Sequence, residues 1–327
     1  ENFASLNRNK RSAVLNLKDP EDAALARRLI LEADVVVENN RPGVMDRLGL
    51  GYAAMSAEKP GLIFCSISAY GQSGPRSGEG GFDLTIQAAA GVMSVTGEPD
   101  GAPVKCGVPL SDFASGLYAA YSIASMLVHV RAGGHGAHID IPMFGCTLGI
   151  AALQTSEYFG NDRSPVKLGS AHPRNAPYQA FHAQDGYFAI AAGNHKLWLA
   201  VLEVVGMPEL ADDERFISTT DRARNQAALK DILEVVFTQK PVAHWIDAFN
   251  RAGVPHARIN DYAAALADPQ TEHMGWVQDL ELPNGKSTRT FTSPIRLNGE
   301  GFGVRRPPPA LGQHTDEIRQ QFAAKEA

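Results

Sequence analysis

Asp112 is the residue of this chain whose surroundings most clearly suggest chemistry. It lies between a short apolar run, 104–110, and a long apolar stretch with helical periodicity, 113–130. A carboxylate at the start of a helix is stabilised by unpaired backbone N–H groups and by the positive end of the helix dipole. Such a residue can be a simple N-cap, or an ionised nucleophile directed into a cleft. Taken alone, Asp112 leaves both interpretations open.

Basic side chains gather near the start of the chain and after an expected strand that ends at Glu38-Asn39. A solvated charged face is one explanation. Their place in loops around parallel strands favours the other, an anionic ligand such as a nucleotide phosphate. These basic residues are Arg8, Lys10, Arg11, Lys18, Arg41 and Arg47.

Several common kinds of site have no signature in this sequence. His129, His135 and His138 are separated by glycines and lack the helical spacing of HExxH, so no metal site is expected. Neither a P-loop nor a GxGxxG fingerprint after a strand occurs, and no GxSxG elbow is present. We therefore expect no metal and no redox cofactor.

Composition limits the class of protein further. The 327 residues carry a formal charge of −6, which argues against a dedicated nucleic-acid binder. No uninterrupted apolar stretch is expected to cross a membrane. Cys65, Cys106 and Cys146 are far apart and lie in apolar surroundings, so each is expected to be a small buried hydrophobe in a reducing compartment. A cytoplasmic location follows, in the bacterial cytosol or in the mitochondrial matrix of a eukaryote.

The first half of the chain alternates between strand and helix patterns. Strands are expected at 12–17, 33–39 and 61–71, with helices between them, which indicates a parallel sheet of the Rossmann-like kind. A glycine-rich loop at 71–81, a helix at 83–94, a strand ending at Leu110 and the long helix from Asp112 follow. Ligands bind near the carboxyl ends of such strands. The polar residues expected there are Glu38, Asn39, Asn40, Ser66, Ser68 and Tyr70.

The second half has a different pattern. A hairpin with an Asp185-Gly186 turn is expected within 177–193, followed by helices near 195–205, 227–238 and 242–251 and by strands within 277–297. A proline-rich strap and a helix capped by Thr315 end the chain. We therefore expect an α/β protein with a large domain at 1–153, a smaller α+β domain at 154–296, and a tail at 297–327 that returns to the large domain.

Several segments, in order and spacing, resemble the class III CoA-transferases, also called the formyl-CoA transferase or CaiB-BaiF family. The segments of the first half are NRNKRSAVLNLKDP, ADVVVENNRPGVMDRLGLGY, IFCSISAYGQSGP, GFD and GVPLSDFASGLYAA. Those of the second half are GSAHPRNAPYQAF, ELADDERF, GVPHARIN and RPPPALGQHT, which resemble the branch that uses dicarboxylates, especially succinyl-CoA:glutarate CoA-transferase. The resemblance covers essentially the whole chain and implies the CoA-transferase family III fold.

The resemblance also implies roles for particular residues. The aspartate of the LSDFASGLY motif is the family's nucleophile and falls on Asp112, which would form a mixed anhydride and then an aspartyl-CoA thioester. Succinyl-CoA and a free dicarboxylic acid are the implied substrates, and His172 and Arg174 are candidates for binding the second carboxylate. Contacts with CoA carry over to Leu15, Lys18, Asn39, Arg41, Arg47, Gly81, Phe82 and Asp83, with Lys18 and Arg47 at the phosphates.

Two departures from the family pattern bear on function. Racemases of the superfamily carry GHD where this chain has GFD, so Phe82 removes the imidazole that two-base epimerisation needs. The chain also starts at Glu1 inside the family domain, without the opening strand–helix segment that supplies part of the nucleotide pocket. The family further implies an interlocked homodimer. An acyl-CoA racemase, a non-catalytic CoA-binding homologue and an acyl-CoA hydrolase stay open as alternatives.

Overall fold

The computed structural model describes residues 2–323, and these residues form two compact units. The first unit comprises residues up to Val92, Lys105–Arg163 and Leu266 onwards; the second comprises Met93–Val104 and Ser164–Ala265. The expected domain limits at 153/154 and 296/297 remain a prediction. The units differ from them in three stretches, because 93–104 packs with the second unit and both 154–163 and 266–296 pack with the first.

A parallel sheet of three strands is the framework of the first unit. Its order is β1 (Val35–Glu38), β2 (Ile63–Ser68) and β3 (His138–Pro142), with Val36 opposite Phe64 and Cys65 opposite Ile139. Because side chains alternate along a strand, β2 contributes to a core on each face. The expected parallel sheet is therefore confirmed for the strands expected at 33–39 and 61–71.

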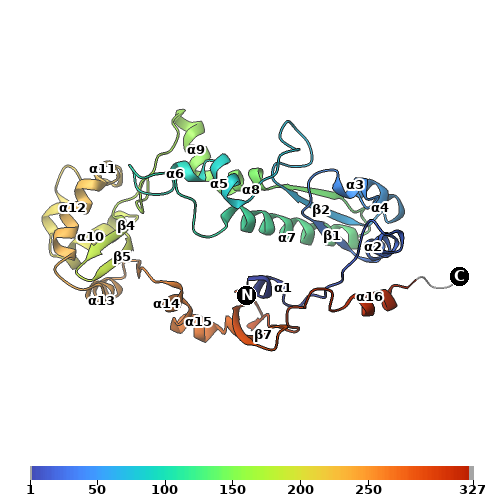
Figure 1. Cartoon of the computed structure of the whole chain (residues 1–327). Coiled ribbons are helices and arrows are strands. Elements are labelled where there is room, and N and C mark those ends of the chain that lie inside the picture. The colour runs from blue at the N-terminus through green and yellow to red at the C-terminus, as the bar shows by residue number, and fades with distance from the viewer. Residues whose placement is uncertain (1, 324–327) are drawn as a thin grey trace. The chain divides into compact units, whose positions relative to one another are not determined.

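Helices cover both faces of this sheet (Figure 1). On one face Phe64 packs with Met55 and Leu62 against α2 and α4. On the other face Cys65 and Ile141 pack with Cys146 and with Ala114 of α7. The helices of this unit are α1 (Asn2–Asn7), α2 (Pro20–Glu32), α3 (Val44–Arg47), α4 (Tyr52–Glu58), α5 (Asp83–Ala89), α7 (Leu110–Arg131), α8 (Met143–Ile150), α9 (Ala152–Asn161), α15 (Pro269–Met274) and α16 (Thr315–Gln321).

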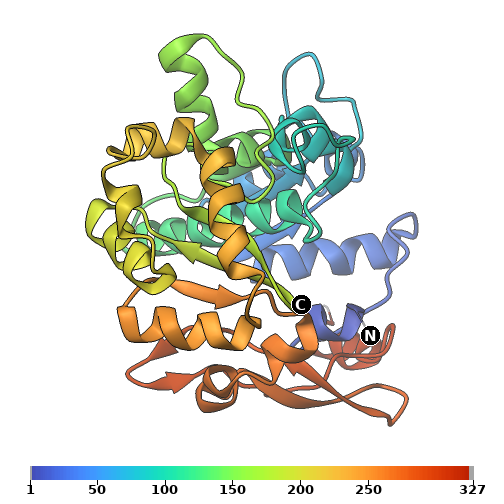
Figure 2. The same cartoon turned by 90° about the vertical axis from the view of Figure 1, so that its left-hand side faces the viewer.

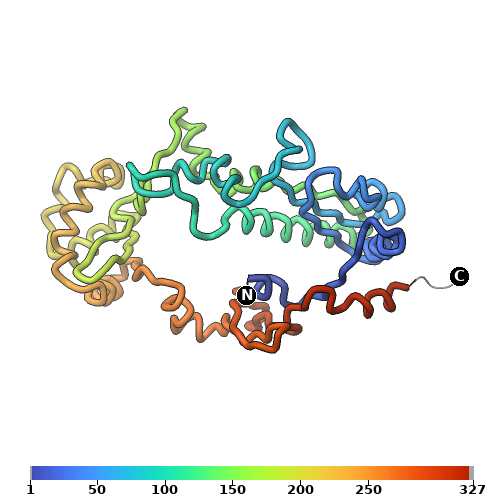
Figure 3. Tube along the Cα trace, in the orientation of Figure 1, coloured from blue at the N-terminus to red at the C-terminus, as the bar shows by residue number. Residues whose placement is uncertain are grey.

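Residues 12–22, near the start of the chain, lie beside the tail at 314–319 in the first unit (Figures 2 and 3). The His314 N–H donates to the Ser12 carbonyl at 2.9 Å, and the Val14 N–H donates to Thr315 Oγ1 at 3.0 Å. Arg319 forms an ion pair with Asp22 of α2. The tail thus packs within the first unit, and the expected three-part division of the chain stays a prediction. Two antiparallel pairs of strands precede it: β7 (Val277–Glu281) with β8 (Ser287–Phe291), and β9 (Arg296–Leu297) with β10 (Glu300–Gly301).

Three expectations about local structure are wrong. Residues 12–17 form no strand, because their backbone bonds to the tail rather than to a neighbouring strand. No strand precedes α7 either, since the Cys106 N–H is bound by a side chain of α5. The helix expected at 83–94 breaks at Gly91, whose φ of 82° suits glycine, giving α5 and α6 (Val92–Val95).

The second unit is a three-stranded antiparallel sheet covered by helices. The expected hairpin is confirmed as β4 (Tyr178–Ala183) and β5 (Gly186–Ala191), and β6 (His256–Arg258) pairs with β5. Its aromatic core includes Phe181, Phe188 and Trp245. The helices are α10 (His195–Val205), η1 (Pro208–Ala211), α11 (Thr219–Arg224), α12 (Gln226–Phe237), α13 (Val242–Ala252) and α14 (Tyr262–Leu266).

A buried arginine holds one side of the second unit. The Arg222 guanidinium donates to the carbonyls of Ala176 and Phe216, at 2.9 Å each, and lies 5.3 Å from the Trp198 ring. Burial lowers the pKa of Arg222. Because backbone carbonyls take the place of a carboxylate, this side chain fixes the loops that precede β4 and α11.

Helix α7 meets the length and apolar composition of a membrane-spanning helix, in contrast to the expectation from sequence. The first unit uses one face of it, where Ala114 and Ala119 pack against the sheet. A stripe on the opposite face is exposed and apolar: Phe113, Leu117, Tyr121 and Val128, with Leu117 69% and Val128 70% exposed. We call these four residues the α7 stripe.

Candidate active site

Asp112 is the third residue of α7, not its N-cap. The helix begins at Leu110, and Pro109, whose ring fixes φ near the observed −71°, occupies the cap position without a side-chain hydrogen bond. The interpretation of Asp112 as a cap is therefore wrong. Its carboxylate still lies in the first turn, where the helix dipole stabilises negative charge.

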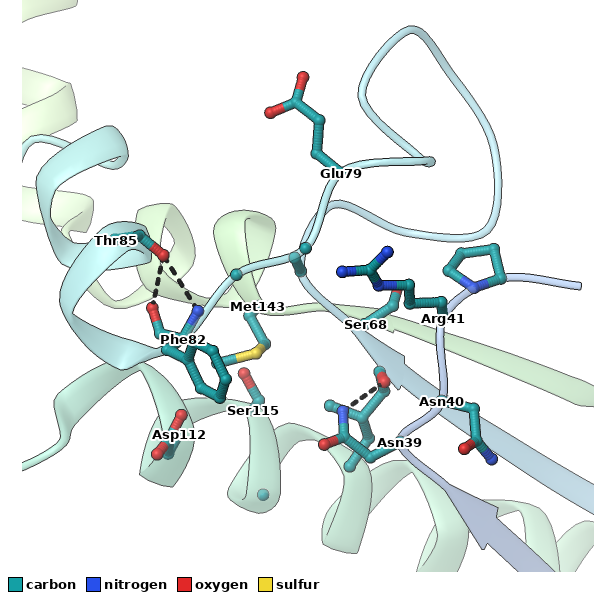
Figure 4. A pocket seen from close by; sticks show the side chains of 16 residues that line it. Asn39, Asn40, Arg41, Ser68, Glu79, Phe82, Thr85, Asp112, Ser115 and Met143 are labelled. Carbon is teal, nitrogen blue, oxygen red and sulfur yellow. Dashed lines mark hydrogen bonds between the residues drawn. The ribbon is translucent and has the colours of Figure 1, made fainter. Parts of the chain in front are cut away.

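The Asp112 side chain opens into a cavity of about 740 Å³ in the first unit (Figure 4). This volume is within the range of small-molecule sites. Residues from the ends of β1 and β2, the glycine loop, α5, α7 and α8 line it: Asn39, Asn40, Arg41, Pro42, Ile67, Ser68, Ala69, Glu79, Gly80, Gly81, Phe82, Thr85, Asp112, Ser115, Gly116 and Met143. The carboxyl ends of parallel strands thus meet the first turn of a helix, as expected for this class of sheet.

Asn39 and Ser115 form fixed parts of the wall. The Asn39 Nδ2 donates to the Ile67 carbonyl at 2.6 Å, which ties the end of β1 to β2 and leaves Oδ1 as the free end of the amide (Figure 4). The Ser115 hydroxyl is buried and donates to the Ser111 carbonyl at 2.7 Å. Both side chains are therefore held before any ligand arrives.

One guanidinium closes the glycine loop at 71–81 on itself. Arg76 donates from Nη2 to the Tyr70 hydroxyl at 2.6 Å and to Glu79 Oε2 at 2.7 Å, and its guanidinium lies 3.8 Å from the Tyr70 ring. This pairing lowers the pKa of Glu79. The Glu79 carboxylate lines the cavity, but its charge is paired with Arg76.

Phe82 places an aromatic ring beside the Asp112 carboxylate (Figure 4). The Phe82 N–H donates to Thr85 Oγ1 at 3.0 Å, and the Thr85 hydroxyl donates back to the Phe82 carbonyl at 2.9 Å. The ring is 83% exposed. A rigid backbone thus presents an apolar surface to the cavity next to the carboxylate.

The charge of Asp112 has no partner within residues 2–323, because no described hydrogen bond or ion pair reaches its carboxylate. Partial burial raises the pKa of Asp112, and the nearby charge of Asp83 raises it further. Arg41 has no ion pair in the same part of the chain, and its guanidinium lies over Gly80. The cavity therefore combines an uncompensated anion with an uncompensated cation.

Four of the residues implied to contact CoA line this cavity with Asp112: Asn39, Arg41, Gly81 and Phe82. Asp83 lies next to it but faces the start of α7, where Oδ1 accepts the Ser111 N–H at 2.9 Å. Leu15, Lys18 and Arg47 belong to the same unit but do not line the cavity. Their predicted roles therefore depend on a ligand that extends beyond it.

The two candidates for binding a second carboxylate lie in the second unit. The Arg174 N–H donates to His172 Nδ1 at 3.1 Å, and the His172 ring stacks on Tyr178 at 4.9 Å. The Arg174 side chain is exposed and forms no ion pair with any described residue. This loop thus combines an exposed guanidinium, which pairs with no described carboxylate, with an imidazole held by the Arg174 N–H and the Tyr178 ring.

Sequence reasoning missed several lining residues. Thr85, Ser115, Gly116 and Met143 lie on helices whose apolar pattern does not reveal which face meets a cavity. Ser68 and Asn40 were expected at strand ends and do line it. Ser66 and Tyr70 were also expected, but their hydroxyls bond to His138 and Arg76.

Metal-ligating groups and thiols do not gather at this site. Among residues 2–323, no three His, Cys, Asp or Glu side chains lie together in a way that could hold a metal ion. Cys65 and Cys146 are buried as expected, and burial raises the pKa of the Cys65 thiol to about 11. Cys106 is only partly buried, which corrects the expectation for that residue.

Comparison with known proteins identifies the class to which this fold and cavity belong. Residues 1–315 match CoA-transferase family III. The chain is 39% identical to acetyl-CoA:oxalate CoA-transferase of Acetobacter aceti, over 99% of this chain and 83% of that protein. It is 34% identical to succinate–glutarate CoA-transferase of Agrobacterium fabrum, over 97% and 79%. A crystal structure of a CAIB/BAIF family protein from Brucella suis superposes with a TM-score of 0.84 at 38% identity, covering 98% of this chain and 83% of that one.

The chain therefore belongs to CoA-transferase family III, and the family expected from its motifs is confirmed. It is a CoA-transferase, and CoA thioesters are its substrates. The α/β fold with a parallel sheet agrees with the structural relative.

Proposed function

We propose that this enzyme moves CoA from an acyl-CoA, with succinyl-CoA as the expected donor, to a free dicarboxylic acid, with Asp112 as the covalent nucleophile. One observation carries the proposal. The unpaired Asp112 carboxylate opens into the cavity that also contains Asn39, Arg41, Gly81 and Phe82, the residues implied to contact CoA. A nucleophile and its expected ligand contacts thus meet in one place.

The reaction would proceed in four steps. An Asp112 oxygen attacks the thioester carbonyl, which forms a mixed anhydride and releases CoA thiolate. The thiolate attacks the aspartyl carbonyl, which forms an aspartyl-CoA thioester and frees the donor acid. The acceptor carboxylate then displaces thiolate to give a second anhydride, and the returning thiolate takes the acyl group and restores the Asp112 carboxylate. Each intermediate keeps the energy of the thioester as long as water is excluded.

The chain's own residues would position the reactants rather than activate a strong base. A carboxylate is a weak nucleophile, so a fixed geometry must supply much of the rate. The apolar ring of Phe82 beside Asp112 would reduce access of water to the reacting carbonyl. Asn39 presents its free Oδ1 for an amide N–H of the pantetheine arm. Lys18 and Arg47 would meet the phosphates outside the cavity.

A dicarboxylic acceptor is supported by the relatives, whose names specify oxalate and glutarate. The exposed Arg174 guanidinium, in the loop whose backbone N–H holds the His172 ring, suits the second carboxylate of such an acid. We expect Arg174→Met to raise KM for glutarate and for oxalate while KM for acetate stays unchanged. Arg224→Met, at an exposed position of α11, is the matched control.

Trapping the intermediate tests the nucleophile. After incubation with succinyl-CoA and hydroxylamine, mass spectrometry should find the modification on the peptide that contains Asp112. Asp112→Asn should lose transfer by about 10⁴-fold or more while CoA still binds, since covalent catalysis depends on this oxygen. Asp231→Asn, on the exposed face of α12, should behave like the unaltered enzyme. Normal transfer by Asp112→Asn would refute the proposal.

The same assay separates the alternatives. A racemase would exchange the α-proton of its acyl-CoA in deuterated water without an acceptor acid, and a hydrolase would release thiol without one. The described lining of the cavity holds no imidazole, and Glu79 is paired with Arg76, so a second base beside Asp112 is missing from that lining. A non-catalytic homologue would show no labelling at Asp112.

A homodimer is part of the proposal. The α7 stripe leaves four large apolar side chains exposed on one face of a single helix. Surfaces of this kind mark protein interfaces, and a second copy of this chain is the occupant implied by the family.

The enzyme is proposed to work in a reducing compartment, the bacterial cytosol or the mitochondrial matrix, because its cysteines lie unpaired in the described structure.

A further inference from the structure

A chain of hydrogen bonds joins α5 to the segment that enters α7. The Cys106 N–H donates to Gln87 Oε1 at 2.9 Å, and Gln87 Nε2 donates to Asp83 Oδ2 at 2.8 Å. The other carboxylate oxygen, Asp83 Oδ1, accepts the Ser111 N–H at 2.9 Å. Gln87 is completely buried, so water cannot replace these partners.

The two ends of this hydrogen-bonded network determine which kinds of side chain can join them. Both ends are backbone N–H groups, which can only donate. Two donors can be joined through two side chains only if one is a carboxylate, which accepts twice, and the other is an amide, which accepts on one side and donates on the other. Asp83 and Gln87 are such a pair. Either order of amide and carboxylate gives every donor an acceptor. Two amides would set two NH₂ donors against each other, and two ionised carboxylates would set two acceptor oxygens against each other with no proton between them.

The bonds act on the part of α7 that carries the nucleophile. Pro109 offers no side-chain cap, so the Ser111 N–H would be an unpaired donor without Asp83. Asp112 is the next residue, and Cys106 lies four residues before the helix begins. The network thus holds both the approach to the helix and its first turn against α5.

We propose that Asp83 and Gln87 are positioning residues that fix the Asp112 carboxylate in the cavity, and that Asp83 acts through this network rather than as a contact to CoA. The inference deepens the proposed function and depends on it. Both Asp83 oxygens already accept hydrogen bonds, and a carboxylate would repel the phosphates of CoA. Gln87, for which the sequence suggested no role, is the second side chain of this hydrogen-bond network.

The negative charge of Asp83 also acts on the Asp112 carboxylate. Asp83 is the charged group that acts on Asp112 and raises its pKa, after the larger effect of burial. Arg41 and Glu79 are the other charged residues of the cavity lining, and Glu79 is neutralised by Arg76. Moving the negative charge from position 83 to position 87 would place it one hydrogen bond further from α7.

An amide–carboxylate exchange tests the proposal. Asp83→Asn leaves two amides between two donors, and Gln87→Glu leaves two carboxylates, so each single variant must break one bond. We expect each to lower kcat by about 10- to 100-fold with KM for succinyl-CoA changed less than about 3-fold, because a displaced nucleophile affects chemistry more than binding. The Gln87→Glu defect should shrink at low pH, where a proton on the carboxylate restores the missing donor.

The double variant Asp83→Asn/Gln87→Glu restores an amide and a carboxylate in the reverse order. We expect it to recover kcat to within about 5-fold of the unaltered enzyme and to recover Tm, with the acid limb of kcat moved to lower pH. Asp231→Asn serves as the neutral control for loss of one charge.

Two results would overturn the inference: a double variant no more active and no more stable than the worse single variant, or an Asp83→Asn variant whose only defect is a raised KM for succinyl-CoA. The Tm comparison between the single and double variants can be made without any transfer activity. It therefore separates a failure of this inference from a failure of Asp112 as the nucleophile, which trapping reports independently.

Discussion

Two adjacent glycines of the cavity wall should respond in opposite ways to the same substitution. A Cβ added at Gly81 would lie 2.9 Å from the Ala69 Cβ and 2.9 Å from the Ile86 Cδ1. The three atoms nearest to a Cβ at Gly80 all belong to the Arg41 guanidinium, and the shortest distance, 3.4 Å to Nη2, is an ordinary contact. Neither glycine has a positive φ, so steric contact alone separates them.

The magnitude follows from the surroundings. Ile86 is completely buried and Ala69 nearly so, so neither can retreat freely from a new methyl group. Overpacking of this kind costs about 1–3 kcal/mol. For a unit of this size each kcal/mol lowers Tm by about 2–4 °C. We expect Gly80→Ala to change the free energy of unfolding by less than about 0.5 kcal/mol.

Thermal unfolding of the two variants, followed by succinyl-CoA kinetics, is the assay. Gly81→Ala should unfold at lower temperature, and adding Ala69→Gly should recover part of the loss by removing one of the two close contacts. Gly80→Ala should keep its Tm but raise KM for the thioester a few-fold by crowding Arg41. Equal Tm values for Gly80→Ala and Gly81→Ala would refute the reasoning from packing.

Three further predictions concern pH, the second unit and assembly. kcat should decline as pH falls through the raised pKa of Asp112, because protonation removes the nucleophile; an acid limb at or below the ordinary value of 3.8 would contradict this. Arg222→Met should destabilise the second unit by about 3 kcal/mol or more in urea unfolding, since it leaves buried carbonyls unpaired, whereas Arg224→Met should cost less than about 0.5 kcal/mol. Leu117→Glu should shift the mass measured by light scattering from dimer toward monomer, because it places a charge in the α7 stripe; an unchanged dimer would exclude this face as the interface.

The sequence predicted the elements whose pattern is local and repeated. The apolar strands at 35–38 and 63–68, the hairpin around Asp185 and the long helix all show their own periodicity, and the structure has them. The apparent strand at 12–17 has the same alternation but lies against the tail, about 300 residues away in sequence. Alternation alone does not specify a partner.

The residues of the candidate site likewise include some that the sequence could predict and some that depend on contacts between distant segments. Asn39 and Arg41 could be placed because strand ends are readable, and Asp112 because it precedes an apolar helix; Phe82 was placed only through the resemblance of the GFD segment to the family. That Asp112 is the third residue of its helix, with the cap supplied by Asp83 from another helix, follows from contacts between distant segments. Such contacts leave no periodic signal in a single sequence.

The contacts of Arg76 with Tyr70 and Glu79 determine where residues could be inserted into this protein. Because Arg76 bonds to Tyr70 at one end of the loop and to Glu79 at the other, residues 73–75 form the tip of a loop whose two ends are already held. Extra residues inserted there would add a small entropic cost without pulling on Gly80 and Phe82. The tip of this loop is therefore a natural place to graft a fluorescent reporter that senses the neighbouring cavity without occupying it.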